Sequence, residues 1–258
     1  MTIMESIDFS YDGKYSRTYG IYNVRLDGSM YEENFSASRE LHETTIRGNP
    51  VPYFHGVTYA PLEFELTFAF SKKWDDKTIS EVVRWLCGQT YYKPLFLAEN
   101  PSKIYYCICV DDPKIVHNGC REGYVKLKMR CDSPYVYSNI RTDKVLDFSS
   151  NPNGSPVQFI NYGDVICKPE ITIEKVGAGD ISIFNLSNKN MEFKFTGLAD
   201  KEIVYVDNER EDIITNIPLE YRYDNFNNNY LKMVRGVNNL KIVGNCKIQF
   251  RYRFKNLM

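Results

Sequence analysis

Residues 61–86 read PLEFELTFAFSKKWDDKTISEVVRWL, and this stretch decides the fold. From residue 62 to residue 70 the apolar side chains occupy alternate positions, which predicts a β-strand with one buried face. The apolar face holds Leu62, Phe64, Leu66, Phe68 and Phe70, and the opposite face holds Glu63, Glu65, Thr67 and Ala69. A short loop then leads into the clearest helix pattern of the chain, residues 78–87. We therefore expect a sheet layer followed directly by a single helix.

Start and stop signals bound this helix. Thr78 and Glu81 have the spacing of a capping box, in which each side chain accepts a hydrogen bond from the other residue's backbone N–H. Asp75 and Asp76 precede it, where the helix dipole favours negative charge, and Gly88 suits the position after its end. The expected apolar stripe is Ile79, Val82, Val83 and Leu86, with Trp85 at its border as a core residue or an interface anchor.

Residues 36–60, just before the strand, predict a long hairpin arm with its tip near Gly48-Asn49-Pro50. Pro50 and Pro52 exclude an ordinary central strand, because proline cannot donate to a sheet ladder. An arm of this kind cannot bury its apolar side chains against itself, so it either meets a partner surface or folds back on its own domain. The candidate interface residues are Arg39, Leu41, Ile46, Arg47, Val51, Tyr53 and Phe54.

Short strands complete the first domain. They are expected at 6–11, 21–26 and 30–35, with Asp-Gly turns at 12–13 and 27–28, and at 95–98, 104–110 and 124–131. The last strand has an outward basic row, Lys126, Lys128 and Arg130, which is either a solvated face or a surface for a polyanion or an acidic protein.

The second half of the chain predicts only strands and turns. Residues 149–156 are turn-rich and form a linker or a long turn. Strands at 170–175 and 180–184 flank a hairpin turn at 176–179, and further strands are expected at 191–196, 202–206 and 247–254. We expect a mainly β protein in which an N-terminal β-sandwich with one helix and the arm, residues 1–138, precedes a C-terminal sandwich or jelly roll, residues 139–258.

Composition narrows the function. The 258 residues carry a formal net charge of -1, which excludes a broadly basic nucleic-acid binder. No apolar run is long enough to span a bilayer, and the first residues lack the features of a signal peptide, so we expect cytoplasmic synthesis and no membrane insertion. The chain has seven cysteines without a C-x-x-C pair, and most of them are expected to be buried thiols rather than disulfides.

No catalytic, cofactor or metal site is expected. Cys107, Cys109, His117 and Cys120 are the sharpest metal candidates, since thiolate and imidazole suit zinc, but the first two share a strand face and are equally explained as core. Glu63 and Glu65 share a strand face as a glycosidase pair would, and as any solvated face would. Carbohydrate binding without catalysis is an alternative, because Tyr205, Tyr221, Tyr223, Phe226 and Tyr230 are residue types that stack on sugars; they are otherwise core and loop residues.

A resemblance covers nearly the whole chain. The first domain resembles that of siphophage distal tail proteins at Tyr19-Gly20-Ile21, Ile46-Arg47-Gly48, residues 60–68, Arg84-Trp85-Leu86 and residues 131–138. The second is similar to that family's galectin-like or carbohydrate-binding-module-like domain at residues 161–164, 167–171, 195–198, 206–208, 230–231 and 236–239.

The resemblance implies a structural virion protein, not an enzyme, located at the tail tip. Members of the family form a hexameric ring whose arms belt neighbouring subunits, and the ring joins the tail tube protein to the tail-associated lysin. Phage DNA passes through the lumen. The C-terminal domains project outward and in some phages carry receptor-binding proteins or contact host cell-wall polysaccharide. No cofactor is implied. The rival interpretation is a non-catalytic carbohydrate-binding protein.

Overall fold

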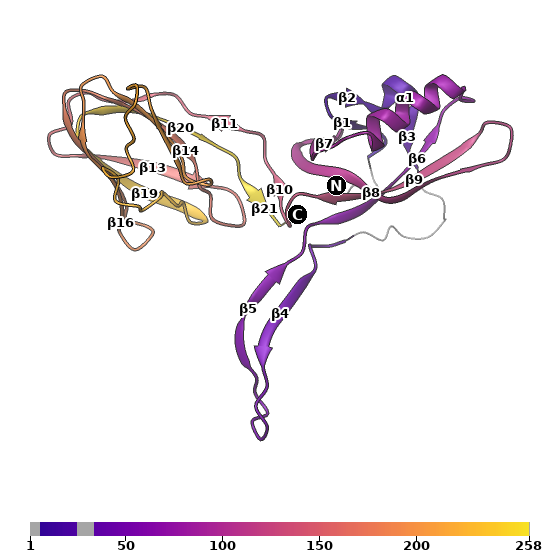
Figure 1. Cartoon of the computed structure of the whole chain (residues 1–258), viewed down its shortest axis with the longest axis horizontal. Helices are drawn as coiled ribbons and strands as arrows, with labels where there is room; N and C mark the ends of the chain where they lie inside the picture. The colour runs from indigo at the N-terminus through magenta and orange to yellow at the C-terminus, as the bar shows by residue number, and fades with distance from the viewer. Residues whose placement is uncertain (1–5, 25–33, 258) are drawn as a thin grey trace. The chain divides into compact units, whose positions relative to one another are not determined.

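The computed structural model describes residues 6–24 and 34–257. The chain divides into two compact units, one over Met1–Tyr137 with Leu257–Met258 and one over Ser138–Asn256 (Figure 1). The turn expected at Asp27-Gly28 and most of the strand expected at 30–35 lie outside the described residues. Among those described, no helix has the length and apolar character needed to cross a membrane.

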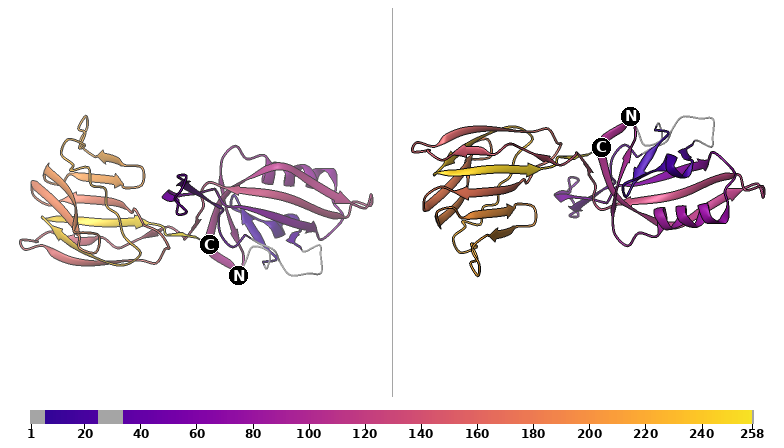
Figure 2. Two further views of the ribbon diagram at one scale, coloured as in Figure 1. Left: turned by 90° about the horizontal axis from the view of Figure 1, so that it is seen from below. Right: turned by 90° about the horizontal axis from the view of Figure 1, so that it is seen from above.

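Unit 1 is built on one antiparallel sheet in the order β2-β1-β7-β8-β9-β6-β3. The sheet curls, so that the ring of Phe9 in β1 comes within 6.4 Å of the ring of Phe68 in β6. Figure 2 shows α1 lying along one face of this sheet. The elements are β1 Phe9–Tyr11, β2 Lys14–Tyr15, a 3-10 helix Ser16–Tyr19, β3 Ile21–Asn23, β4 Arg39–Thr44, β5 Tyr53–Tyr59, β6 Glu63–Phe70, α1 Asp76–Cys87, β7 Lys93–Leu97, β8 Asn100–His117, β9 Gly123–Cys131 and β10 Val136–Tyr137.

Strand β6 has the predicted alternation over most of its length, except that Thr67 of the expected outer face is also buried and Phe70 is only half-buried. Leu62, Phe64, Leu66 and Phe68 are buried in the core of unit 1. On the other face, Lys128 of β9 forms ion pairs with Glu63 at 2.8 Å and with Asp111 at 3.2 Å. The basic row of β9 is therefore part of a paired, solvated face, and Glu63 is held by a lysine rather than aimed at a substrate.

The helix differs from its prediction at its start and on its buried face. It begins at Asp76, and the cap is Asp75, whose carboxylate accepts from the Thr78 N–H at 2.7 Å. Aspartate is at least as good a cap as threonine, so the helix starts earlier than a Thr78 cap would allow. Val83 is 54% exposed, whereas Trp85 is buried and donates from Nε1 to the Tyr11 carbonyl. Because the large indole is buried, the buried face of α1 consists of Val82, Trp85 and Leu86.

Unit 2 is a sandwich of two antiparallel sheets (Figure 2). Its core is formed by residues from both sheets. One sheet has the order β11-β20-β14-β17-β18, with β12 also paired to β20, and the other has the order β13-β19-β15-β16. The elements are β11 Arg141–Thr142, β12 Leu146–Phe148, β13 Ser155–Asn161, β14 Glu170–Lys175, β15 Gly179–Asn185, β16 Met191–Leu198, β17 Ile203–Asp207, β18 Asp212–Thr215, β19 Gly236–Val243, β20 Cys246–Tyr252 and β21 Lys255–Asn256.

Two sequence-based assignments need correction. Residues 176–179 do not close a hairpin, because β14 pairs with β17 and β20 while β15 pairs with β16 and β19, in the other sheet. Both strands turn isoleucines into the core, and a crossing between sheets has the same local pattern as a hairpin. The strand expected at 104–110 runs over Asn100–His117, with a register shift between Val110 and Lys114.

Buried asparagines join the loops of unit 2 to its sheets. Asn208 is fully buried; its Nδ2 donates to the Pro169 carbonyl, and its Oδ1 accepts from the Leu231 N–H. Asn185 donates to the Lys232 carbonyl and to the Asn238 Oδ1. Because a side-chain amide can both donate and accept, each of these residues satisfies backbone groups that no strand ladder reaches.

Candidate interaction surfaces

The arm is anchored at its base in unit 1. Ala37 and Leu62, which flank the arm, are both buried in the core of this unit. The Ala60 N–H donates to the Ser38 carbonyl at 3.0 Å, and the Leu62 N–H donates to the Ser133 carbonyl. The two ends of the arm are thus held side by side.

Beyond this base, β4 and β5 form a two-stranded sheet of their own (Figure 1). The register runs from Arg39 opposite Tyr59 to Thr44 opposite Tyr53, with a bulge after His42. The chain reverses in the tip between the two strands, where the Asn49 N–H donates to the Ile46 carbonyl. A two-stranded hairpin is at best marginally stable alone, so packing against a further surface would stabilise it.

The apolar side chains of the arm are exposed. Leu41 is 61% exposed and Phe54 is 63% exposed, and Arg39 and Arg47 are exposed as well. The arm therefore does not fold back on its own unit, which excludes that alternative. The other large apolar residues of the arm that are exposed are Ile46, Val51, Tyr53 and Tyr59.

The two faces of the ribbon differ in polarity. The register and the alternation of side chains place Leu41, Phe54 and Val57 on one face, with Glu43 opposite Phe54 and with Arg39 and Tyr59 at the base. The other face is mainly polar, although Tyr53 lies on it opposite Thr44. There His42 Nε2 lies 2.6 Å from the Thr58 hydroxyl, and His55 Nε2 lies 2.9 Å from the Thr44 hydroxyl. Burial of the face that holds Leu41, Phe54 and Val57 would therefore stabilise the arm.

The aromatic residues proposed as a glycan or partner surface differ in their exposure and in their hydrogen bonds. Phe226 is buried, with its ring 4.8 Å from that of Phe195, so it is a core residue and not part of a surface. Tyr221 is 77% exposed, and Tyr223 is 40% exposed with its hydroxyl donating to Asp212. Tyr205 donates to Glu170, and Tyr230 donates to the Glu211 carbonyl.

Burial and an acceptor carboxylate act together on Tyr205. Burial, and then its hydrogen bond to Glu170, raise the pKa of Tyr205 to about 12. The hydroxyl therefore stays protonated and committed to a structural hydrogen bond. Tyr221 and Tyr223 remain as the exposed aromatic surface.

The candidate zinc ligands are not brought together. Cys107 lies opposite Cys131 in the β8–β9 ladder, both buried, and His117 Nδ1 accepts from the Gly119 N–H. Cys120 is exposed in the following turn. Within residues 6–24 and 34–257, no group of three or more His, Cys, Asp or Glu side chains is arranged to hold a metal.

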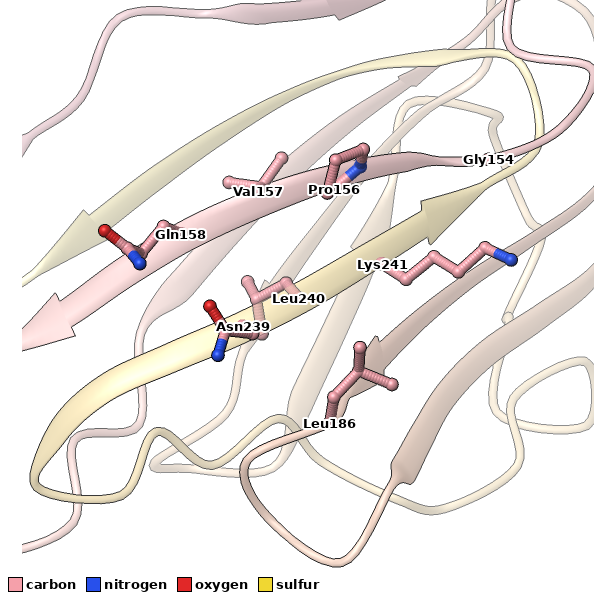
Figure 3. Close-up of a pocket in the computed structure, with 8 residues that line it drawn as sticks. All are labelled: Gly154, Pro156, Val157, Gln158, Leu186, Asn239, Leu240 and Lys241. Atoms are coloured by element: carbon pink, nitrogen blue, oxygen red, sulfur yellow. The ribbon is translucent and has the colours of Figure 1, made fainter.

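A groove that the sequence does not reveal lies on the outer face of the β13-β19-β15 layer (Figure 3). Its polar side chains are Gln158, Asn239 and Lys241, and its apolar lining includes Pro156 and Leu186. Residues of the adjacent strands β13 and β19 form it together with Leu186, which follows β15, so the groove is a tertiary property. The lining contains no carboxylate, cysteine or histidine, so it offers binding contacts rather than a catalytic group.

Comparisons with known proteins agree with this architecture over the whole chain. A family model described as a phage tail protein N-terminal domain matches residues 4–133, and one described as a phage tail C-terminal domain matches residues 135–252. The SPbeta prophage-derived protein YomH of Bacillus subtilis strain 168 is 34% identical over 255 residues, which are 99% of this chain and 100% of that protein.

Two solved structures share the fold. The SPP1 Dit (gp 19.1) protein, described as a paradigm of the hub adsorption apparatus in phages that infect Gram-positive bacteria, matches with a TM-score of 0.69 at 16% identity, over 96% of this chain and 98% of that chain. A chain of the phage P2 baseplate in its activated conformation matches with a TM-score of 0.52 at 9% identity, over 96% and 97%. The resemblance to the distal tail protein fold is thereby confirmed.

Proposed function

This chain belongs to the phage tail protein family whose N- and C-terminal domains it contains, and from that premise we propose that it is the distal tail protein of a long non-contractile tail. Six copies form a ring at the tail tip, with residues 1–138 making the ring and residues 139–258 facing outward. The ring joins the tail tube protein to the tail-associated lysin and leaves a lumen for DNA. It acts by assembly and not by catalysis.

The observation that carries this proposal is the arm. Leu41 and Phe54 are more than half exposed on a ribbon that pairs with no strand of its own unit among the described residues. A hairpin with one apolar face gains stability when a neighbour covers that face. When the covering surface belongs to another part of the next copy, the contact is heterologous, and such contacts form a ring where the rotation between neighbours closes.

The outward unit offers a second contact surface. Tyr221 and Tyr223 are exposed aromatic side chains, a type enriched where proteins bind partners. We propose this surface for a receptor-binding protein or host cell-wall polysaccharide. Purified cell walls and the full-length chain provide the test: if polysaccharide is the partner, the walls should pull down the full-length chain and a Tyr221→Ser variant should lose this binding, whereas if the partner is a protein the walls should pull down neither.

Ring formation is tested with a variant that lacks the arm, and the structure defines the residues between which the arm is replaced. Residues 39–59 are replaced by Asn-Gly, because the Ser38 and Ala60 pair at the base has the geometry that a two-residue turn can close. The full chain should give six-fold rings in negative-stain images and a hexamer mass by light scattering. The replacement should remain folded and monomeric.

Two results would contradict the proposal. Rings that persist after the replacement would show that the arm is not the belt. A full-length chain that stays monomeric even with purified tail-tip protein, and binds polysaccharide tightly, would favour the rival carbohydrate-binding function. Circular dichroism on both proteins controls for loss of folding.

A further inference from the structure

Two thiols lie in contact between the helix and the sheet of unit 1. Cys87 is the last residue of α1, Cys109 lies in β8, and their sulfur atoms are 3.7 Å apart. Both side chains are half-buried at the margin of the core. We propose that Cys87 and Cys109 are an oxidation site, which a low-molecular-weight disulfide such as glutathione disulfide converts to a protein disulfide.

Burial of the other thiols makes Cys87 the selective point of attack among the cysteines. A buried thiol stays protonated and is a poor nucleophile. Burial raises the pKa of Cys131 and Cys167 to about 12 and that of Cys246 to about 11, and it raises the pKa of Cys107 as well. Cys120 is exposed, so a reagent reaches it, but the expected product there is a mixed disulfide.

The order of the chemical steps follows from the contact between the two sulfurs. The contact between the two sulfurs lowers the pKa of Cys87 and raises that of Cys109. The Cys87 thiolate attacks glutathione disulfide, forming one sulfur–sulfur bond and expelling one glutathione thiolate. Cys109 then loses its proton, attacks the Cys87 sulfur and expels the second glutathione. Two protein thiols are oxidised, and one glutathione disulfide is reduced to two thiols.

The geometry needs only a local adjustment. A disulfide is about 2.05 Å long, so the sulfurs must approach from van der Waals contact. Rotation about the Cys87 and Cys109 side chains, which already lie in contact, supplies this approach. The bond would tie the end of α1 to β8.

The redox state of the Cys87 and Cys109 pair should change when a virion component leaves the cell. Thiols stay reduced in the cytoplasm and oxidise outside the cell. We therefore expect the pair to be reduced during assembly and oxidised in the released particle. This timing rests on the proposed function, whereas the reaction of the pair does not.

The test uses the full-length chain carrying Cys120→Ser, which removes the exposed thiol. After complete reduction and exposure to glutathione disulfide, intact-mass measurement should show the loss of two hydrogen atoms, and peptide mapping should show Cys87 linked to Cys109. Adding Cys109→Ser should stop the reaction at a stable glutathione adduct on Cys87. The oxidised protein should unfold at a higher temperature than the reduced protein.

Three outcomes would overturn the proposal. They are two thiols that remain free while the reagent is in excess, a glutathione adduct that persists although Cys109 is present, and a bond between Cys107 and Cys131 instead. Ring formation is scored separately by light scattering. A chain that oxidises as expected but forms no ring would contradict the proposed function and leave the oxidation site intact.

Discussion

The most informative perturbation in unit 2 is Arg222→Met, which breaks a buried ion pair. The Glu202 side chain is fully buried and that of Arg222 is 11% exposed. Arg222 Nε donates to Glu202 Oε1 at 2.7 Å, and Nη2 donates to Oε2 at 2.9 Å. The Thr215 hydroxyl and the Ala199 N–H complete the shell of the carboxylate. The pair holds the loop that carries Tyr221 and Tyr223.

Methionine keeps the length of the side chain but leaves the Glu202 carboxylate buried and unpaired. Removing one partner of a buried pair costs about 3–5 kcal/mol of unfolding free energy. For a unit of this size, that lowers the unfolding temperature by roughly 10–20 °C. The matched control is Arg210→Met, because Arg210 is 83% exposed and 3.8 Å from Asp207, and exposed pairs contribute at most about 1 kcal/mol.

Tryptophan fluorescence can show which unit unfolds in a given thermal transition. Both tryptophans, Trp74 and Trp85, lie in unit 1, so tryptophan fluorescence follows that unit alone, whereas calorimetry follows both. Arg222→Met should therefore move one calorimetric transition and leave the fluorescence transition in place. A shift seen equally by both probes would mean that the substitution acts outside unit 2.

The stability of Arg222→Met should also change with pH in a direction that can be worked out from Glu202. Burial raises the pKa of Glu202, but the Arg222 guanidinium, the Ala199 N–H and the Thr215 hydroxyl outweigh it and lower the pKa below its usual value. In the natural chain, the ionised Glu202 therefore stabilises the folded state at pH values above its unfolded pKa of about 4.3. This stabilisation is lost as the pH falls through the lower folded pKa.

Without Arg222, burial dominates and the folded pKa of Glu202 lies above the unfolded value. Protonation then favours the folded state, so the deficit of Arg222→Met should shrink as the pH falls from 7 toward 5. Adding Glu202→Gln should recover part of the loss at pH 7. A deficit below about 1 kcal/mol, or one that grows on acidification, would refute this reasoning.

Three further predictions concern the arm and the loops. Phe54→Ala should weaken ring assembly roughly tenfold by light-scattering titration, since a half-exposed phenylalanine gains about 1.5 kcal/mol on burial, while Thr58→Ala on the polar face should have little effect. Asn208→Ala should cost about 2–4 kcal/mol in urea unfolding, because it leaves a buried N–H and a buried carbonyl unpaired, whereas the exposed Asn239→Ala should stay within about 0.5 kcal/mol. Leu219→Gly should stabilise unit 2 by about 0.5–1 kcal/mol in the same assay, because Leu219 is 95% exposed and has a φ of 64°.

Elements with strong periodicity were predictable from the sequence. The alternation of residues 62–70 identified β6 and its buried face, and the two prolines of residues 36–60 identified an arm outside the main sheet. Boundaries were less predictable, because Asp75 and Thr78 are both competent caps and only the packing of Trp85 selects the face. The crossing at 176–179 could not be told from a hairpin, since pairing partners are set by strands far away in the chain.

The candidate surfaces show the same division. The exposure of Leu41 and Phe54 followed from local reasoning, because a hairpin cannot bury both of its faces. Phe226 was misassigned because an aromatic residue in an asparagine-rich loop resembles a sugar platform, whereas its ring fills the space beside Phe195. Buried Asn208 was missed for the converse reason: its hydrogen-bond partners, at Pro169 and Leu231, come from distant segments.

The arm also explains why the sequence reveals one side of the proposed ring contact and not the other. The donor side is continuous in the chain: one ribbon, anchored by Ala37 and Leu62 and polarised by its register. A receiving surface on the neighbouring copy needs no continuity, because any adjacent strands and loops can cover Leu41 and Phe54. Since such a contact joins two different surfaces of the same chain, each subunit can give one arm and receive another. Closure into a ring then satisfies every arm, whereas an isolated chain always leaves its own arm uncovered.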